Sequence, residues 1–153
     1  VSKLSREIAA RELAVVSRLL GWEAEKLEAV SVDSSGPGNV VSLEIESEGL
    51  TEVFTGFGEK GVSAEAVAEK VAREARAYLA SGVPVGEHLA DQLLLPMALA
   101  GSGAFRTTPL SRHAATNIEV IRAFLPVAID VTRDGSSDCV VRVWSSPSTR
   151  TSP

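Results

Sequence analysis

Cysteine is nearly absent from this sequence, since Cys139 is the only one among 153 residues. A single thiol cannot form an internal disulfide, and zinc sites built from several thiolates are excluded. This use of cysteine fits a reducing compartment, so we expect a cytoplasmic protein. No run of about 18 apolar residues occurs, so no membrane span is expected. The first residues carry charges throughout and do not resemble a signal peptide.

Aromatic residues are also scarce, and basic residues are fewer than acidic ones. Aromatics make up 5% of the chain and hydrophobic residues 44%, so the core is expected to rest on Leu, Val, Ile and Ala. The net charge is −5, which argues against a broad basic surface that coats nucleic acid. A local site that binds one end of a nucleic acid remains compatible with this charge.

The spacing of apolar residues predicts helices together with antiparallel hairpins, and this combination indicates an α+β fold. Ser63 is expected to cap one helix, and Pro96 to end or kink another. Thr116 and Glu119 match a capping box that would start a third helix. Helices are predicted over residues 4–20, 63–81, 87–95 and from 116, and strands over residues 27–33, 41–46, 50–57, 105–108, 127–132 and 140–144.

The Gly-Val-Pro segment at residues 82–84 predicts a boundary between two domains. Residues 1–82 would then form a small helix-and-sheet domain, and residues 83–144 a second domain. Residues 145–153 are rich in Ser, Thr and Pro, which predicts a disordered tail.

A G-x-G-x-x-G pattern occupies residues 56–61, after a predicted strand and before a predicted helix. This is the local setting of a dinucleotide-binding turn. The preceding strand, however, belongs to a predicted antiparallel hairpin, and no second strand with an acidic end follows the helix. A glycine-rich turn is the competing interpretation, and a dinucleotide- or protein-binding module remains an alternative function.

His113 follows Ser111 and Arg112, just before the helix expected from Thr116. Neutral imidazole is a good nucleophile near pH 7. The N-terminus of a helix offers free N–H groups and a positive dipole end, both of which suit phosphate. These features make His113 a candidate nucleophile, and the competing interpretation is a polar loop residue.

His88 and Asp91 lie three residues apart on one predicted helix, so both can meet the same ligand. With His113 they could form a metal site of two imidazoles and a carboxylate, although the spacing is not diagnostic. The competing interpretation is a solvated polar face.

Two longer stretches of the sequence resemble RNA 3'-terminal phosphate cyclases. Residues 86–101, G-E-H-L-A-D-Q-L-L-L-P-M-A-L-A-G, are similar to the family's C-terminal motif. Residues 111–118, S-R-H-A-A-T-N-I, are similar to its active-site S-x-H-x-x-T-N-I. Shorter likenesses to the bacterial branch lie at residues 36–39, 42–46, 58–60 and 62–65. The resemblance covers about residues 6–131, and the two motifs at this separation form a specific signal.

The resemblance implies an ATP-dependent ligase that converts an RNA 3'-terminal phosphate into a 2',3'-cyclic phosphodiester. His113 would take AMP from ATP and pass it to the RNA end, where the 2'-hydroxyl would displace it. Many relatives have Tyr where this chain has His88, a position that stacks on adenine, and imidazole offers a smaller stacking area. A divalent cation, Mg or Mn, is expected with the triphosphate. The implied adenylate contacts are His88, Leu89, Ala90, Asp91 and Gln92.

The resemblance also implies an architecture. Residues 1–82 would be a small inserted domain with thioredoxin-like elements, and residues 83–144 the C-terminal part of a βαβαββ-type repeat. Family members are about twice as long, and their N-terminal half contributes metal and phosphate contacts. Because the sequence begins at Val1 and lacks that half, we expect a C-terminal fragment with little activity alone. A non-catalytic, cyclase-like ribosome-assembly factor is the alternative, although such relatives lack the histidine motif.

Overall fold

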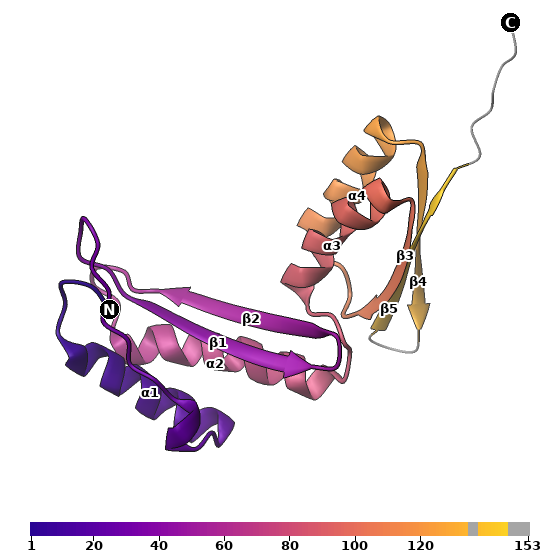
Figure 1. The fold of residues 1–153 in the computed structure, drawn as a ribbon. Coiled ribbons are helices and arrows are strands. Elements are labelled where there is room, and N and C mark those ends of the chain that lie inside the picture. The colour runs from indigo at the N-terminus through magenta and orange to yellow at the C-terminus, as the bar shows by residue number, and fades with distance from the viewer. Residues whose placement is uncertain (135–137, 147–153) are drawn as a thin grey trace, which may run out of the picture. The chain divides into compact units, whose positions relative to one another are not determined.

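A computed structural model describes residues 1–134 and 138–146 of the chain. The chain divides into two compact units, Val1–Ala80 and Ser81 onward. The described residues form helices and two antiparallel sheets, which confirms the predicted α+β fold (Figure 1). No helix in these residues is both long and apolar enough to cross a membrane.

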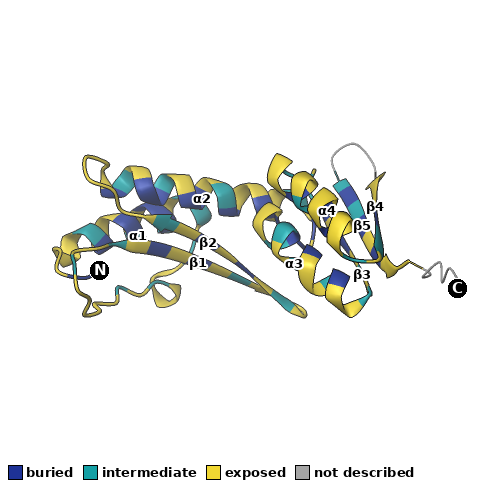
Figure 2. Cartoon of the chain, turned by 90° about the horizontal axis from the view of Figure 1, so that it is seen from above, coloured by how far each residue is buried: buried dark blue, intermediate teal, exposed yellow. Residues whose placement is uncertain are grey.

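The first unit packs two helices against an antiparallel hairpin. Val16 of the first helix, Leu43 and Phe54 of the hairpin, and Val71 of the second helix share one core. The buried positions recur as separate bands along the second helix, as expected when a helix buries one face (Figure 2). The elements are α1 (Arg6–Leu20), the 3-10 turn η1 (Ala24–Lys26), β1 (Val40–Ser47), β2 (Leu50–Phe57) and α2 (Ala64–Ser81).

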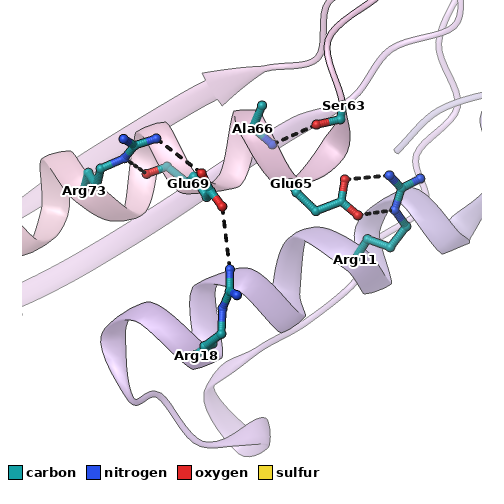
Figure 3. A network of polar contacts seen from close by, with 7 residues as sticks. All are labelled: Arg11, Arg18, Ser63, Glu65, Ala66, Glu69 and Arg73. Atoms are coloured by element: carbon teal, nitrogen blue, oxygen red, sulfur yellow. Dashed lines mark hydrogen bonds and ion pairs between the residues drawn. The ribbon is translucent and has the colours of Figure 1, made fainter.

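Polar contacts connect α1 to α2 at the surface (Figure 3). The Arg11 guanidinium donates two hydrogen bonds of 2.6 Å to the Glu65 carboxylate, and Arg18 lies 3.6 Å from Glu69. The predicted cap of α2 is confirmed, because the Ala66 N–H donates to the Ser63 hydroxyl at 3.2 Å. Since these ion pairs are exposed to solvent, they stabilise the unit only weakly, and the shared core contributes more.

The strand predicted over residues 27–33 is absent, so this prediction is wrong. A strand requires a neighbour that pairs with its N–H and C=O groups along its length. Here the Val32 N–H donates to the Val1 carbonyl at 3.0 Å, and the Val1 amino group donates to the Val30 carbonyl at 2.8 Å. Val30 and Val32 remain 51% and 58% exposed, so the segment has strand-forming residues without a full partner strand.

The glycine-rich pattern at residues 56–61 forms a turn between an antiparallel hairpin and α2. Gly61 has a φ of +87°, which favours glycine. A Cβ atom added to Gly56 would lie 2.3 Å from Cγ2 of Val71, so β2 can approach α2 only because Gly56 has no side chain. The structure thus supports the glycine-rich turn and not a dinucleotide-binding βαβ unit.

Replacing Gly56 with alanine is expected to destabilise the protein by about 1–3 kcal/mol, because the β-branched Val71 side chain has little freedom to move aside. Urea unfolding followed by circular dichroism measures this change. The matched control is Gly36→Ala, since a Cβ at Gly36 meets nothing within 4 Å. We expect the control to stay within about 0.5 kcal/mol of the unaltered protein, and equal losses in both variants would contradict the explanation.

Glu12 is an acidic side chain buried in the first unit, with only 2% of its surface exposed. The Asn39 amide donates a hydrogen bond of 2.5 Å to its carboxylate. Burial raises the pKa of the Glu12 carboxyl above its usual value of 4.5, and the Asn39 hydrogen bond opposes this only in part. The folded protein therefore holds the Glu12 proton more tightly than the unfolded chain does.

This raised pKa predicts a pH-dependent loss of stability. As the pH rises from 4.5 to the higher pKa of the folded state, ionisation of buried Glu12 increasingly disfavours folding, and the penalty is constant above that range. Glu12→Gln removes the ionisation, so the stability of the variant relative to the unaltered protein should increase between pH 4 and pH 7. Urea midpoints at both pH values measure this, and a constant or falling difference would contradict it.

The second unit places two helices on one face of a three-stranded antiparallel sheet (Figure 1). The central strand pairs with both others, in the order β3-β5-β4. Leu94 and Ile118 of the helices are buried with Val141 of the central strand. The elements are α3 (Glu87–Ala100), β3 (Ser102–Thr107), α4 (Arg112–Phe124), β4 (Val127–Asp134) and β5 (Asp138–Ser145).

Two predicted helix boundaries in this unit are wrong. α3 does not end at Pro96 but continues to Ala100, and the buried Leu94 and Ala98 anchor it on both sides of the exposed proline. α4 begins at Arg112 instead of at residue 116, because the Ser111 hydroxyl caps it by accepting the Ala114 N–H at 3.1 Å.

The predicted capping box is therefore not formed. Thr116 lies inside α4, and its hydroxyl donates to the Arg112 carbonyl at 3.0 Å. Glu119 instead pairs with Arg122 at 2.5 Å. Starting the helix at Arg112 adds the fully buried Ala114 to the apolar face, which favours the earlier start.

The strands predicted over residues 127–132 and 140–144 are confirmed, since β4 and β5 pair antiparallel from Val127–Ser145 to Asp134–Asp138. The connecting residues 135–137 lie outside the described residues. The predicted tail, residues 145–153, also lies outside them except for Ser145, which ends β5, and Ser146.

Candidate functional site

The first turn of α4 presents His113 to solvent. The Ser111 cap places Arg112 and His113 at the first two helical positions, where backbone N–H groups have no partner within the helix. The His113 side chain is 81% exposed. The imidazole therefore lies inside the helix terminus instead of in a loop before it, next to amides that suit phosphate.

Asp91 of α3 fixes this imidazole from the neighbouring helix. One carboxylate oxygen lies 3.0 Å from Nδ1 of His113, and the other accepts a hydrogen bond of 3.0 Å from the Asn117 amide. His113 and Asn117 are four residues apart, so they lie on one side of α4 and hold the carboxylate between them. The Asp91 side chain is 24% exposed, so the carboxylate is partly shielded from water while the imidazole is open to solvent.

This arrangement determines which imidazole nitrogen is free. Nδ1–H donates to a carboxylate, so the neutral ring carries its proton on Nδ1 and its lone pair on Nε2. The carboxylate also stabilises positive charge that develops on the ring when Nε2 attacks an electrophile. The site therefore combines an imidazole whose Nε2 can act as a nucleophile with a helix N-terminus whose free N–H groups suit an anion.

The remaining predicted adenylate contacts lie on α3 with different exposures. His88 and Gln92 are exposed, and Leu89 is half-buried. Ala90 is fully buried in the core, so its side chain contributes packing instead of a surface for a ligand. Asp91 is the member of this set that the structure brings to His113.

The metal site considered for His88, Asp91 and His113 is not formed. In the part of the chain that the structure describes, no three His, Cys, Asp or Glu side chains gather closely enough to hold an ion. Both oxygens of Asp91 are instead engaged by α4.

Asn117 belongs to this cluster through its hydrogen bond to Asp91, and the sequence alone did not single it out as a candidate. The available signal was its position four residues after His113, which places both on one face of a helix. The misplaced helix start at Thr116 hid this relation, because it left His113 outside the helix.

Residues 1–80 of the chain match the family model described as "RNA 3'-terminal phosphate cyclase (RTC), insert domain". The chain belongs to the RNA 3'-terminal phosphate cyclase family. The matched residues coincide with the first compact unit, so the cluster of His113, Asp91 and Asn117 lies in the second unit, beyond the insert domain.

Proteins named RNA 3'-terminal phosphate cyclase are similar to this cyclase-family chain over most of its length. The relative from Koribacter versatilis is 47% identical over 135 residues, which are 88% of this chain and 38% of that protein. The relative from Ectopseudomonas mendocina is 46% identical over 144 residues, which are 94% of this chain and 42% of that protein. The relative from Salmonella typhimurium is 60% identical over 105 residues, or 69% of this chain and 31% of that protein. The chain thus spans less than half the length of these relatives.

Proposed function

We propose that this chain is the part of an RNA 3'-terminal phosphate cyclase that carries the nucleophile, His113, in the ATP-dependent synthesis of 2',3'-cyclic phosphodiester ends on RNA. The observation that carries the proposal is the 3.0 Å pair between His113 and Asp91 at the exposed start of α4, in a chain of this family. The chemistry proceeds in three steps.

In the first step, the lone pair on Nε2 of His113 attacks the α-phosphorus of ATP. The bond between that phosphorus and the bridging oxygen breaks, pyrophosphate leaves, and AMP is held by a P–N bond. Asp91 stabilises the imidazole as positive charge develops on it. The free amides of the first turn of α4 can bind the phosphate oxygens.

In the second step, an oxygen of the RNA 3'-phosphate attacks the adenylate phosphorus, the P–N bond breaks, and His113 is regenerated. In the third step, the 2'-hydroxyl attacks the terminal phosphorus, its proton passes to solvent, and AMP leaves with the bonding electrons. The adenylate intermediate is needed because the RNA 3'-phosphate dianion is a poor electrophile and has no good leaving group.

Adenylate recognition is proposed for the start of α3, where the exposed His88 and Gln92 flank the residue that holds His113. His88 stacks on adenine, and Leu89 adds apolar surface beside it. Ala90 supports the turn from inside the core. The divalent cation is proposed to arrive with the triphosphate, and none of the described residues is assigned as its ligand because no cluster of three ligands occurs among them.

The finer architecture is part of the same proposal. The first unit matches the insert-domain model and has the order helix, strand, strand, helix, and we infer thioredoxin-like elements for it. In the second unit, Val85 forms a parallel bridge with Thr107 before α3, β3, α4, β4 and β5. This order supports the proposal of a βαβαββ repeat in which a single bridge stands for the first strand. The N-terminal half of a longer enzyme and RNA 3'-phosphate ends are the proposed partners, in the cytoplasm.

The isolated 153-residue chain is expected to form no covalent adduct with AMP, because it spans 38% of the Koribacter versatilis cyclase and lacks the surfaces that the remainder supplies. Incubation with α-labelled ATP and Mg or Mn, followed by denaturing electrophoresis, measures this. The matched sample is a chimera, in which this chain replaces the corresponding region of that relative. Label on the chimera but not on the isolated chain is the expected result, and equal labelling of both would contradict it.

A further inference from the structure

The first unit contains a pocket at the end where α1 and α2 begin (Figure 1). It encloses about 490 Å³, which is within the size range of small-molecule sites. The glycine-rich turn before α2 forms one side of it through Gly58, Glu59 and Lys60. All of its lining residues lie within residues 4–67, so the first unit forms the pocket by itself. The apolar part of the wall consists of Leu4, Ile8, Pro37, Val62, Ala64 and Val67.

A carboxylate lies at the base of this largely apolar pocket. Glu12 lines the pocket and is only 2% exposed. One of its oxygens accepts the Asn39 amide at 2.5 Å, and the other accepts no hydrogen bond from the residues that the structure describes. Since an ionised carboxylate can accept about four hydrogen bonds, most of the accepting capacity of Glu12 is unused.

Asn39 adds a second acceptor to the same base. Its Nδ2 donates to Glu12, which fixes the orientation of the side-chain amide. Its Oδ1 is fully buried and accepts no hydrogen bond. Buried polar atoms in folded proteins nearly always have a partner, so an unpaired oxygen beside a pocket calls for one. The base therefore offers acceptor oxygens from two side chains to a group that can donate.

We propose that this pocket binds a small aliphatic amine, whose ammonium group is held by Glu12 and Asn39. The three N–H donors of an ammonium group match the acceptors that the base leaves open. The apolar stem of the amine covers Leu4 and Val62, which are 40% and 45% exposed and so have surface left to bury. A bound cation also offsets the cost of burying ionised Glu12, the cost that raises the pKa of this carboxyl.

The charges nearer to solvent do not reverse this preference for a cation. Arg11 donates two hydrogen bonds of 2.6 Å to Glu65, so its charge is balanced within an ion pair. Lys60 and Glu59 are exposed, opposite in sign and screened by water and salt. Glu12 is buried, where a lower dielectric constant makes its charge act more strongly on a ligand. The buried carboxylate therefore determines the sign of the ligand.

The test is isothermal titration calorimetry of the 153-residue chain at pH 7 with hexylamine, hexanol and hexanoate. The three probes share one stem and differ in the charge of the head group. We expect hexylamine to bind at least about tenfold more tightly than hexanol, because its hydrogen bonds to the carboxylate are charge-assisted, and we expect no binding of hexanoate. Butylamine should bind more weakly than hexylamine, by up to about fourfold for each methylene removed.

Two variants locate the amine. Glu12→Gln keeps the shape of the side chain and removes its charge, so it should weaken hexylamine by at least about tenfold and leave hexanol unchanged. The matched control is Glu44→Gln, because Glu44 is exposed on β1 and does not line the pocket. We expect no change in this control, and circular dichroism confirms the folding of both variants. In the unaltered chain, the NMR signals of the Asn39 side-chain amide should shift as hexylamine is added.

The proposal is overturned if hexylamine does not bind, if hexanol binds equally well, or if hexanoate binds more tightly. In the last case the N-terminus of α2, and not Glu12, would select the ligand. Unchanged hexylamine binding by Glu12→Gln would place the amine elsewhere on this acidic chain and would also overturn it. The comparison of the three probes needs no variant, so it decides the question even if Glu12→Gln does not fold.

Discussion

His113→Asn is expected to abolish the transfer of label from α-labelled ATP to the chimera defined above. Asparagine can still donate a hydrogen bond to Asp91, so the packing of α4 on α3 is preserved. It has no nucleophilic nitrogen, so the covalent route through AMP is closed. The measurement is protein-bound label after denaturing electrophoresis, with circular dichroism to confirm that the variant folds.

The second histidine provides a matched comparison. His88→Asn removes an exposed imidazole that the proposal assigns to adenine, so it should raise the ATP concentration needed for labelling while leaving label at saturating ATP. The proposal fails if His113→Asn retains label, or if His88→Asn eliminates it at every ATP concentration.

Asp91→Asn is expected to slow adenylylation of the chimera by about a hundredfold or more, without loss of folding. The carboxylate accepts the Nδ1 proton of His113 at 3.0 Å, whereas an amide at this position can donate to Nδ1 instead. The imidazole proton would then shift to Nε2 and remove the lone pair that attacks ATP. Single-turnover labelling at saturating ATP measures the chemical step apart from binding.

Asn117→Ala tests the position of the Asp91 carboxylate independently of its charge. This variant keeps the carboxylate but removes the 3.0 Å hydrogen bond that holds it from α4. We expect a smaller loss of about tenfold, as is typical when a supporting hydrogen bond is removed. A rate for Asp91→Asn equal to that of the unaltered chimera would show that the carboxylate does not control the imidazole.

Local sequence patterns predicted most elements because those elements are stabilised by their own side chains. The alternation of Val41, Leu43 and Ile45 marked β1, and Ser63 marked the start of α2. The strand at residues 27–33 was predicted wrongly because strand formation depends on a partner that the sequence of the segment does not specify. The start of α4 was predicted wrongly because Ser111 and Thr116 both suit a cap, and the burial of Ala114 favours the earlier one.

The candidate site was only partly predictable for a related reason. The family motifs identified His113 and Asp91 as separate candidates, 22 positions apart in the sequence. Their direct contact depends on how α3 packs against α4, which no local pattern encodes. The role of Asn117 follows from the same packing together with the corrected helix start.

The most direct measurement is to locate AMP on the chimera by mass spectrometry, under alkaline conditions that preserve P–N bonds. Trypsin cleaves after Arg112 and Arg122, so His113 lies at the start of a peptide of its own, separate from His88. The proposed function predicts AMP on the peptide of residues 113–122, attached to the imidazole and released by acid. AMP bound to any other residue, or an acid-stable bond, would contradict it.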